Sequence, residues 1–296
     1  MVCINNQERI TIKARAKINL ALDILSKRED GYHNVKMIMQ SVDLYDILKI
    51  NISNGSGIII NSNKYMYCDD KDNLMYVAAE KFLSKVGLVD KKISIDIEKN
   101  IPIQAGLAGG STDAAAVLYG LNTLCNRLSF DQLIDMGSSL GADVPFCLLG
   151  GTCMAEGMGT TLKKIDDMPL CHLLIVKPSN INISTKQAYA LSDEFKIRPN
   201  EEKKFNEMID GIKNQDLNRI SSNLFNKFQD IMNLKKINKI IERLRKSGAL
   251  NACMTGSGSA VYGIFENIDL AMACKNDFDD CETFLVESSN KSLSII

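Results

Sequence analysis

The stretch IPIQAGLAGGSTDAAAVLYGLN, residues 101–122, constrains this chain most, because glycines and small polar residues crowd the start of an alanine-rich helix. A helix N-terminus presents backbone N–H groups without intrahelical partners and about half a unit of positive charge. Glycines ahead of it let a bulky anion approach the backbone. Gly106, Gly109 and Gly110 are bare, and Ser111 and Thr112 add hydroxyl donors. This pattern between a strand and a helix indicates a candidate phosphate loop.

The loop matches neither of the two commonest phosphate motifs. A Walker loop would end in Gly-Lys-Ser/Thr, and a dinucleotide fingerprint would read GxGxxG, whereas this chain has AGLAGG. On the glycines alone, a tight strand-to-helix turn in which Gly109 and Gly110 serve only packing is an equally good interpretation. Other segments have to decide between the two.

Composition and charge narrow the class of protein. The 296 residues are 45% hydrophobic and 24% charged, with a net charge of -1, so a nucleic-acid partner is not expected. The cysteines are odd in number, at 9, and only 2 histidines accompany them, so we expect reduced core thiols without a zinc framework. No stretch has the length or hydrophobicity of a membrane span or a signal peptide, which predicts a cytoplasmic protein without a membrane partner.

Hydrophobic periodicity predicts an α+β fold. In residues 16–25, apolar side chains fall on one face of a strand, and Lys17, Asn19 and Asp23 fall on the other. A helix over 72–87 should stop at Gly87. The other expected elements are strands at 41–52, 55–62, 91–102 and 171–178, a helix capped by Ser129, a lysine-rich helical segment at 196–246 and a turn feeding a strand at 251–266.

A polar segment closed by a proline lies near residues 160–170. Such a segment is typical of a boundary. We therefore predict an N-terminal domain over 1–165 and a C-terminal domain over 166–296.

Three further segments bear on the loop. Lys17 and Asn19 are polar residues of the first strand, and by themselves are typical of a solvated face. Asp143, in GADVPF, lies between a glycine turn and an apolar run, where an aspartate usually caps or turns the chain. TGSGSAVYGIF, residues 255–265, is a glycine-rich turn before a strand.

Taken in order, the Ala-Lys-x-Asn-Leu strand, the glycine-serine loop and the Thr-Gly-Ser-Gly turn resemble the GHMP kinase superfamily over nearly the whole chain. The segment 27–46 with its DGYH turn, the loop and GADVPF are similar to the branch that phosphorylates a cytidyl-linked methylerythritol in non-mevalonate isoprenoid synthesis. The resemblance implies two lobes with the active site in the cleft between them. It also implies ATP and Mg2+ as cofactors and the cytidyl-linked alcohol as substrate, and leaves the metal ligands and oligomeric state open.

The resemblance assigns a catalytic pair and an ATP site. Lys17 and Asp143 match the pair: Asp143 would accept the proton of the attacking hydroxyl, and Lys17 would keep that carboxylate ionised. Asn19 would help to orient the acceptor. The residues matched to ATP are Asn73, Lys99, Pro102, Ile103, Gln104, Ala105, Gly106, Leu107, Ala108, Gly109, Gly110, Ser111 and Thr112.

The resemblance also assigns a base site. Tyr32 and Tyr189 would stack on the cytosine, and His33 would read its edge. The alternatives are core packing for Tyr32 and a surface turn for His33.

Two departures and two rival functions accompany the resemblance. Gln104, Ala105 and Ala108 stand where many members have glycine, so the loop should be stiffer, and Asp113 would favour the helix dipole or lie near magnesium. One rival is a GHMP kinase for homoserine or mevalonate, which the DGYH turn argues against. The other is a non-catalytic nucleotide sensor, which the presence of both Lys17 and Asp143 argues against.

Overall fold

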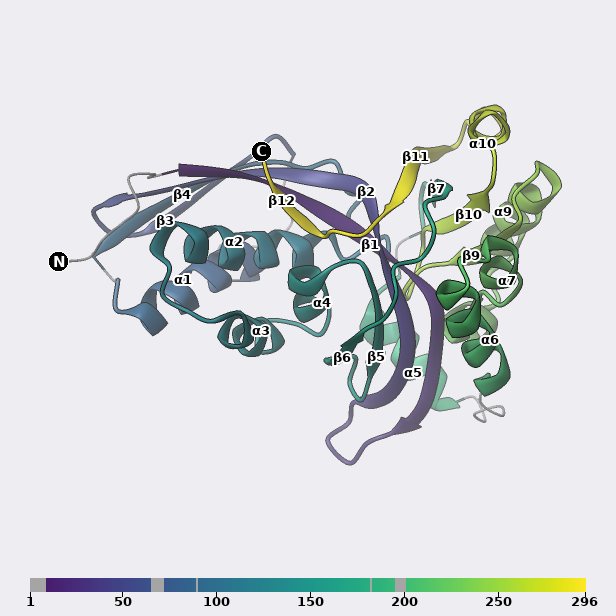
Figure 1. The fold of residues 1–296 in the computed structure, drawn as a ribbon, viewed down its shortest axis with the longest axis horizontal. Coiled ribbons are helices and arrows are strands. Elements are labelled where there is room, and N and C mark those ends of the chain that lie inside the picture. Colours follow the sequence, from purple (N-terminus) through teal and green to yellow (C-terminus); the bar gives the residue numbers. More distant parts are fainter. Residues whose placement is uncertain (1–8, 65–71, 89, 182, 195–200) are drawn as a thin grey trace.

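The computed structural model describes residues 9–64, 72–88, 90–181, 183–194 and 201–296. A long antiparallel hairpin of β1 (Arg9–Lys27) and β2 (His33–Asn54) runs through both halves of the molecule (Figure 1). The strand predicted at 16–25 is therefore confirmed as part of a much longer one. Lys17 and Asn19 of β1 are buried rather than solvated. Lys17 lies against Asp143, and Asn19 is hydrogen-bonded to the segment 255–262 of the second half.

The N-terminal half is a sheet covered by helices on one face (Figure 1). β4 (Lys91–Glu98) pairs antiparallel with β2 and parallel with β3 (Ile58–Ser62), while β5 (Thr152–Glu156) pairs with β2 and with β6 (Thr161–Lys164). The alternation of Ile93, Ile95 and Ile97 sends these side chains into the core. The helices are α1 (Leu74–Val86), α2 (Gly109–Cys125), α3 (Phe130–Ser138) and α4 (Val144–Leu149).

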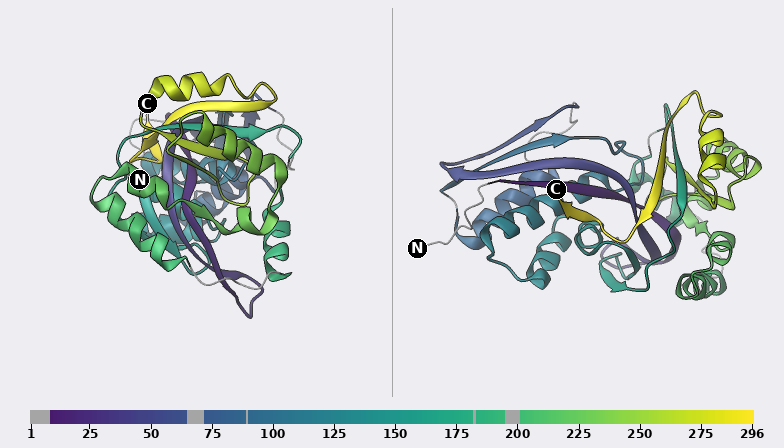
Figure 2. Two further views of the ribbon diagram at one scale, coloured as in Figure 1. Left: turned by 90° about the vertical axis from the view of Figure 1, so that its right-hand side faces the viewer. Right: turned by 45° about the horizontal axis from the view of Figure 1, so that its top comes forward.

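The C-terminal half continues the same sheet through β11 (Cys281–Ser289), which pairs with β2 at one end and with β7 (His172–Pro178) along its length. β10 (Val261–Phe265) and then β9 (Asn251–Met254) follow, and helices cluster around this part (Figure 2). The remaining elements are α5 (Thr185–Glu194), α6 (Glu202–Lys213), α7 (Leu217–Ser222), β8 (Phe225–Asn226), α8 (Lys227–Met232), α9 (Lys235–Lys246), α10 (Ile268–Lys275) and β12 (Leu293–Ile295).

Several local predictions are confirmed. α1 ends at Gly87, whose φ of 70° is left-handed, and Ser129 forms a capping box with Gln132 at the start of α3. The domain boundary at residue 165 stays a prediction. That residue lies between β6 and β7, but β12 pairs with β1 and β11 pairs with β2, so the end of the chain joins both halves.

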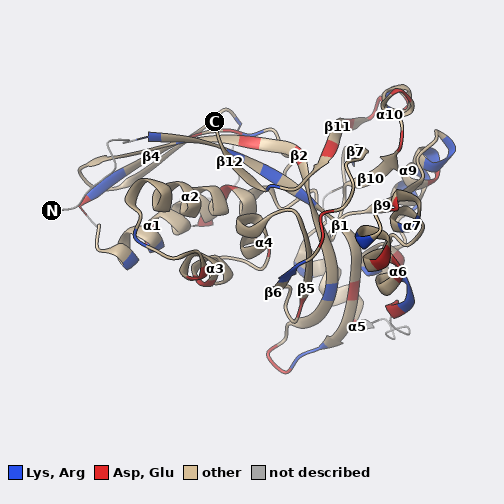
Figure 3. Cartoon of the chain, in the orientation of Figure 1, with Lys and Arg blue, Asp and Glu red and all other residues tan. Residues whose placement is uncertain are grey.

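The charged residues are spread over the molecule (Figure 3), and most of the described cysteines lie in the core. Acidic and basic residues are interspersed over both halves (Figure 3). Among the described residues every cysteine is a free thiol, and all but Cys281 are buried, while Cys3 and Cys68 lie outside those residues. Within the same residues, no helix is both long and apolar enough to cross a bilayer.

The packing of α2 on the hairpin generates a first prediction. A Cβ atom on Gly120 would come within 2.8 Å of the Cδ1 atoms of Ile12 and Ile50. Gly120→Leu should therefore overpack this layer and lower the free energy of unfolding by about 1–3 kcal/mol in urea titrations. Ser84→Leu on the exposed face of α1 is the matched control and should be nearly neutral. Equal stability of the two variants would contradict this close packing.

Candidate active site

A cavity of about 820 Å3 lies where the two halves meet. Its wall combines β1, the residues before α1, the phosphate loop (102–112), the first turn of α5 and the glycine turn (255–258). Of the predicted site residues, all within the described part of the chain, Thr112, Tyr32 and His33 do not line it. Those that do are Lys17, Asn19, Asn73, Lys99, Pro102, Ile103, Gln104, Ala105, Gly106, Leu107, Ala108, Gly109, Gly110, Ser111, Asp143 and Tyr189.

Lys17 and Asp143 come together in this cavity. The Lys17 Nζ is 3.8 Å from Asp143 Oδ2 and donates a hydrogen bond of 2.7 Å to Asn19 Oδ1. Asp143 holds the N-cap position of α4, yet within the described residues its side chain makes no capping bond. The carboxylate is therefore directed at a lysine rather than at its own helix, unlike the usual turn aspartate.

The electrostatics around this pair keep a neighbouring phenol neutral. Burial, and then the negative charge of Asp143, raise the pKa of Tyr189 to about 12. The side chain of Lys17 is 5% exposed and that of Asp143 is 33% exposed. The ammonium is thus held inside the wall, while the carboxylate remains open to a reactant.

The phosphate loop joins β4 to α2. Since α2 begins at Gly109, the N–H groups of its first turn lack intrahelical partners, and Gly109, Gly110 and Ser111 line the cavity. Gln104 and Ala108 adopt left-handed φ values of 53° and 59°. Glycine adopts this conformation at lower cost, so each of these two residues strains the loop by about 1–2 kcal/mol. The stiffness expected of the loop stays a prediction.

Gly106 and Gly256 let the phosphate loop and the glycine turn touch. A Cβ atom on Gly106, whose φ is 76°, would lie 2.2 Å from the carbonyl oxygen of Thr255. The hydroxyl of Thr255 donates to the Gly106 carbonyl at 3.2 Å, and the Ala260 N–H donates to the Ala105 carbonyl at 3.1 Å. This is backbone contact between segments about 150 residues apart in sequence.

Gly109 and Gly110 serve different needs. A Cβ atom on Gly109 would lie 3.1 Å from Ile101 Cγ2 and 3.4 Å from Lys99 Nζ. On Gly110 it would have only Leu74 Cδ1 nearby, at 4.0 Å. The packing interpretation weighed for both glycines therefore describes Gly109, whereas Gly110 borders open space in the cavity wall.

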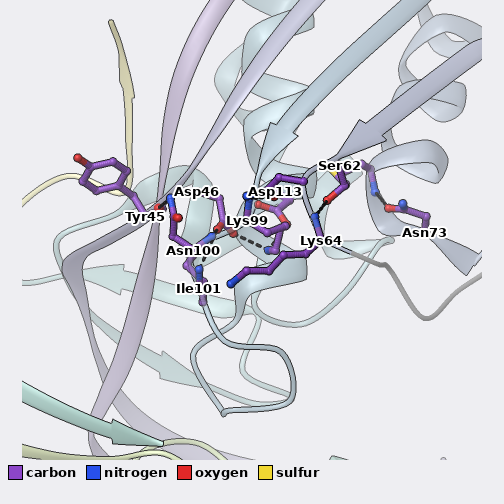
Figure 4. A network of polar contacts seen from close by, with 11 residues as sticks. Tyr45, Asp46, Ser62, Lys64, Asn73, Lys99, Asn100, Ile101 and Asp113 are labelled. Atoms are coloured by element: carbon purple, nitrogen blue, oxygen red, sulfur yellow. Dashed lines mark hydrogen bonds and ion pairs between the residues drawn. The ribbon is translucent and has the colours of Figure 1, made fainter. Parts of the chain in front are cut away.

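Lys99 is held between two buried carboxylates (Figure 4). Its Nζ lies 2.5 Å from Asp46 Oδ2 and 2.6 Å from Asp113 Oδ2. Burial would lower the pKa of Lys99, but the two carboxylates outweigh it and raise that pKa. Burial also raises the pKa of Asp113 well above its usual range, since Lys99 offsets it only in part. Sequence reasoning missed Asp46, because nothing local distinguishes it from other polar strand residues.

The structure brings only two of the three predicted base-site residues together. His33 stacks on Tyr189 with ring centroids 4.8 Å apart, and its Nε2 lies 2.8 Å from Asp193 Oδ1. Tyr32, which is 64% exposed, lies at the turn of the hairpin and does not line the cavity. Asp193 is a further residue that the sequence did not reveal, and its hydrogen bonds from Lys27 and His33 lower its pKa.

Within the described residues, no group of three or more His, Cys, Asp or Glu side chains could hold a metal ion. This does not argue against Mg2+ bound with a nucleotide, because Mg2+ usually takes one or two carboxylates and completes its shell with phosphates and water. Asp113 and Asp143 both line the cavity, and Asp113 Oδ1 is buried without a hydrogen-bond partner among these residues. The carboxylates present therefore fit such an ion.

Comparisons with known proteins agree with this fold and site. The chain matches the GHMP kinases N terminal domain over residues 73–151 and the GHMP kinases C terminal domain over residues 208–278. A homoserine kinase from Cytophaga hutchinsonii is similar in structure, with a TM-score of 0.77 over 99% of this chain and 98% of that one, but is 17% identical and shares the fold alone. The fold and the site thus define a GHMP-type small-molecule kinase.

More similar proteins narrow the family. The 4-diphosphocytidyl-2-C-methyl-D-erythritol kinase of Caldicellulosiruptor bescii is 46% identical over 86% of this chain and 89% of its own length. That of Clostridioides difficile is 41% identical over 97% of both. A crystal structure of 4-(cytidine 5'-diphospho)-2C-methyl-D-erythritol kinase, 27% identical, has a TM-score of 0.78 over 95% of this chain and 99% of that one. The chain belongs to the 4-diphosphocytidyl-2-C-methyl-D-erythritol kinase family.

The contrasting glycines of the loop generate a second prediction. Gly106→Ala should lower the free energy of unfolding by about 1–3 kcal/mol, because its methyl group collides with the Thr255 carbonyl in a left-handed conformation. Gly110→Ala should leave thermal stability native or slightly higher, since alanine favours a helix. It should instead weaken ATP binding about tenfold by filling the space beside the free N–H groups. Melting curves and calorimetric titration with ATP measure the two effects, and a Gly110→Ala variant with native ATP affinity would contradict this role.

Proposed function

We propose that this chain transfers the γ-phosphate of ATP to the 2-hydroxyl of 4-diphosphocytidyl-2-C-methyl-D-erythritol, a step of non-mevalonate isoprenoid precursor synthesis. Family membership over most of the chain supports the substrate. The observation that carries the chemistry is the pairing of Lys17 with Asp143 at 3.8 Å in the cavity that the phosphate loop also lines. We further propose that it acts in the cytoplasm.

Asp143 acts as the proton acceptor in this proposal. Its carboxylate is open to the cavity and bonds no N–H of its own helix in the described structure, so it can accept the hydroxyl proton as the oxygen attacks phosphorus. Lys17 offsets charge that develops on the transferring group. Asn19 fixes the Lys17 ammonium through its 2.7 Å hydrogen bond.

The phosphate loop binds the donor nucleotide. Phosphoryl transfer needs positioning and neutralisation of charge more than covalent chemistry from the protein. The free N–H groups at the start of α2, with the Ser111 hydroxyl, donate to the phosphates. Mg2+ supplies further neutralisation when it is bound with ATP, and the carboxylates available to hold it are Asp113 and Asp143.

The acceptor's base binds where α5 meets the tip of the hairpin. Tyr189 lines the cavity and offers an aromatic surface, and His33 beside it offers a ring nitrogen to the base edge. Since His33 covers Tyr189 in this structure, the base must displace that ring or stack beside it. Tyr32 joins the site in this proposal when the hairpin tip closes over the base.

The rival acceptors are tested directly by a panel. ATP consumption is measured with the cytidyl-linked methylerythritol, homoserine and mevalonate, because kinases of the latter two share this fold. Turnover with the cytidyl compound alone is expected. Turnover with homoserine or mevalonate instead would overturn the proposal, and a chain that binds ATP but turns over none of the three would be a sensor.

The catalytic pair gives a third prediction. Asp143→Asn should lower kcat about a hundredfold or more and leave ATP affinity nearly native, because only the proton acceptor is lost. Lys17→Ala should be similarly impaired, and the double variant should be little worse than either, since the two side chains act as a unit. Single-turnover kinetics measure each rate. Additive losses would show that the two residues work separately.

The base site gives a fourth prediction. Tyr189→Ala should raise the KM for the acceptor by tenfold or more, because loss of stacking costs about 1–3 kcal/mol. The KM for ATP should change little. His33→Ala should erode discrimination between the cytidyl substrate and a uridyl analogue, since only an edge contact distinguishes these bases. If both residues are structural, the melting temperature falls and both KM values move together.

A further inference from the structure

Asp46, on β2, is fully buried and uses both carboxylate oxygens. Oδ1 accepts hydrogen bonds from the backbone N–H groups of Asn100, at 2.6 Å, and Ile101, at 2.9 Å. Oδ2 accepts from the Lys99 ammonium. These three consecutive residues connect the end of β4 to the phosphate loop (Figure 4), so one side chain fixes the path of the backbone just before the loop starts.

The same carboxylate reaches the other end of the loop through Lys99. The Lys99 Nζ that binds Asp46 also binds Asp113 Oδ2 at 2.6 Å, and Asp113 lies in the first turns of α2, directly after the loop. Ile101 gives a second link, since it packs against Gly109 at the start of that helix. Both ends of the loop are therefore tied to one residue of β2.

We propose that Asp46 is a positioning residue for nucleotide binding: it fixes the start of the phosphate loop through two backbone N–H groups and the end of the loop through Lys99 and Asp113. The inference rests on the proposed function, since it takes ATP to be the ligand of the loop. In this arrangement Lys99 affects nucleotide binding mainly by holding α2 in place, because its ammonium is already paired with two carboxylates.

The charge balance shows which substitution tests this. Two buried carboxylates share one ammonium, and the negative charge of Asp46 opposes ionisation of Asp113. Asp46→Asn keeps an oxygen for the two N–H groups and leaves Lys99 paired with Asp113 alone. That variant should fold, whereas Asp46→Ala also leaves two N–H groups without their acceptor and should be the more severe change.

The experiment measures ATP affinity by calorimetry without any acceptor, the KM for each substrate and the melting temperature. Asp46→Asn is expected to weaken ATP binding about tenfold, with the acceptor KM within about twofold of native, because only the loop shifts. Asp46→Ala should weaken ATP binding further. Asp43→Asn is the matched control: it removes an exposed carboxylate of the same strand that pairs with Arg15, and should leave both constants native.

Two results would overturn the proposal. One is native ATP affinity in folded Asp46→Asn. The other is a lower melting temperature with both KM values raised together, which a merely structural residue produces. Asp113→Asn supplies a second arm, because it cuts the link from Lys99 to α2 and leaves Lys99 paired with Asp46. It should also weaken ATP binding, and native ATP affinity in folded Asp113→Asn would contradict a tie through Lys99. ATP binding is measured without an acceptor, so this experiment is independent of the acceptor panel. If the cytidyl compound is not turned over in the panel, the proposed function is wrong, and the ATP affinities still test the role of Asp46.

Discussion

The site depends on one buried asparagine that connects the two halves at the cavity. Asn19 is fully buried on β1, and its Oδ1 accepts from both the Lys17 ammonium and the Gly256 N–H. Its own N–H donates to the Thr255 hydroxyl at 3.1 Å, and its carbonyl accepts from Tyr262 at 2.9 Å. A single residue thus orients the Lys17 ammonium, for which we propose a catalytic role, and fixes the glycine turn against which the phosphate loop packs.

This arrangement has an energetic consequence. A buried amide whose polar atoms are paired stabilises one arrangement of its neighbours, but the same amide is costly wherever those partners are absent. Lys17, the glycine turn and the phosphate loop therefore reach their working positions together, rather than as independent local structures. The strained φ values of Gln104 and Ala108 are tolerated for the same reason, because the surrounding contacts determine the path of the loop.

The local parts of this design could be predicted from the sequence. Alternation revealed the β1 segment, Gly87 and Ser129 marked helix ends, and the glycines marked a strand-to-helix loop. The long-range parts could not. Asp46 and Asp193 are ordinary polar residues until the fold brings partners 54 and 160 positions away beside them. The boundary predicted at residue 165 did not anticipate that β11 and β12 return to pair with β2 and β1. Hydrophobic periodicity predicts strands but does not predict which strands pair.

The two ends of the cavity differ in how they are built, and this bears on how one fold serves several acceptors. At the end that we propose binds ATP, the loop is tied to the hairpin by Asp46 and to the second half of the chain by Thr255. At the end that we propose binds the acceptor, Tyr189 of α5 lines the cavity and His33 of the hairpin stacks on it, while Tyr32 at the hairpin tip is largely exposed. Substitutions at an exposed tip cost little stability, whereas those in a buried network cost several kcal/mol on the order seen for broken buried pairs. A homoserine kinase and a mevalonate kinase share this fold at 17% and 15% identity, so the fold alone does not determine the acceptor.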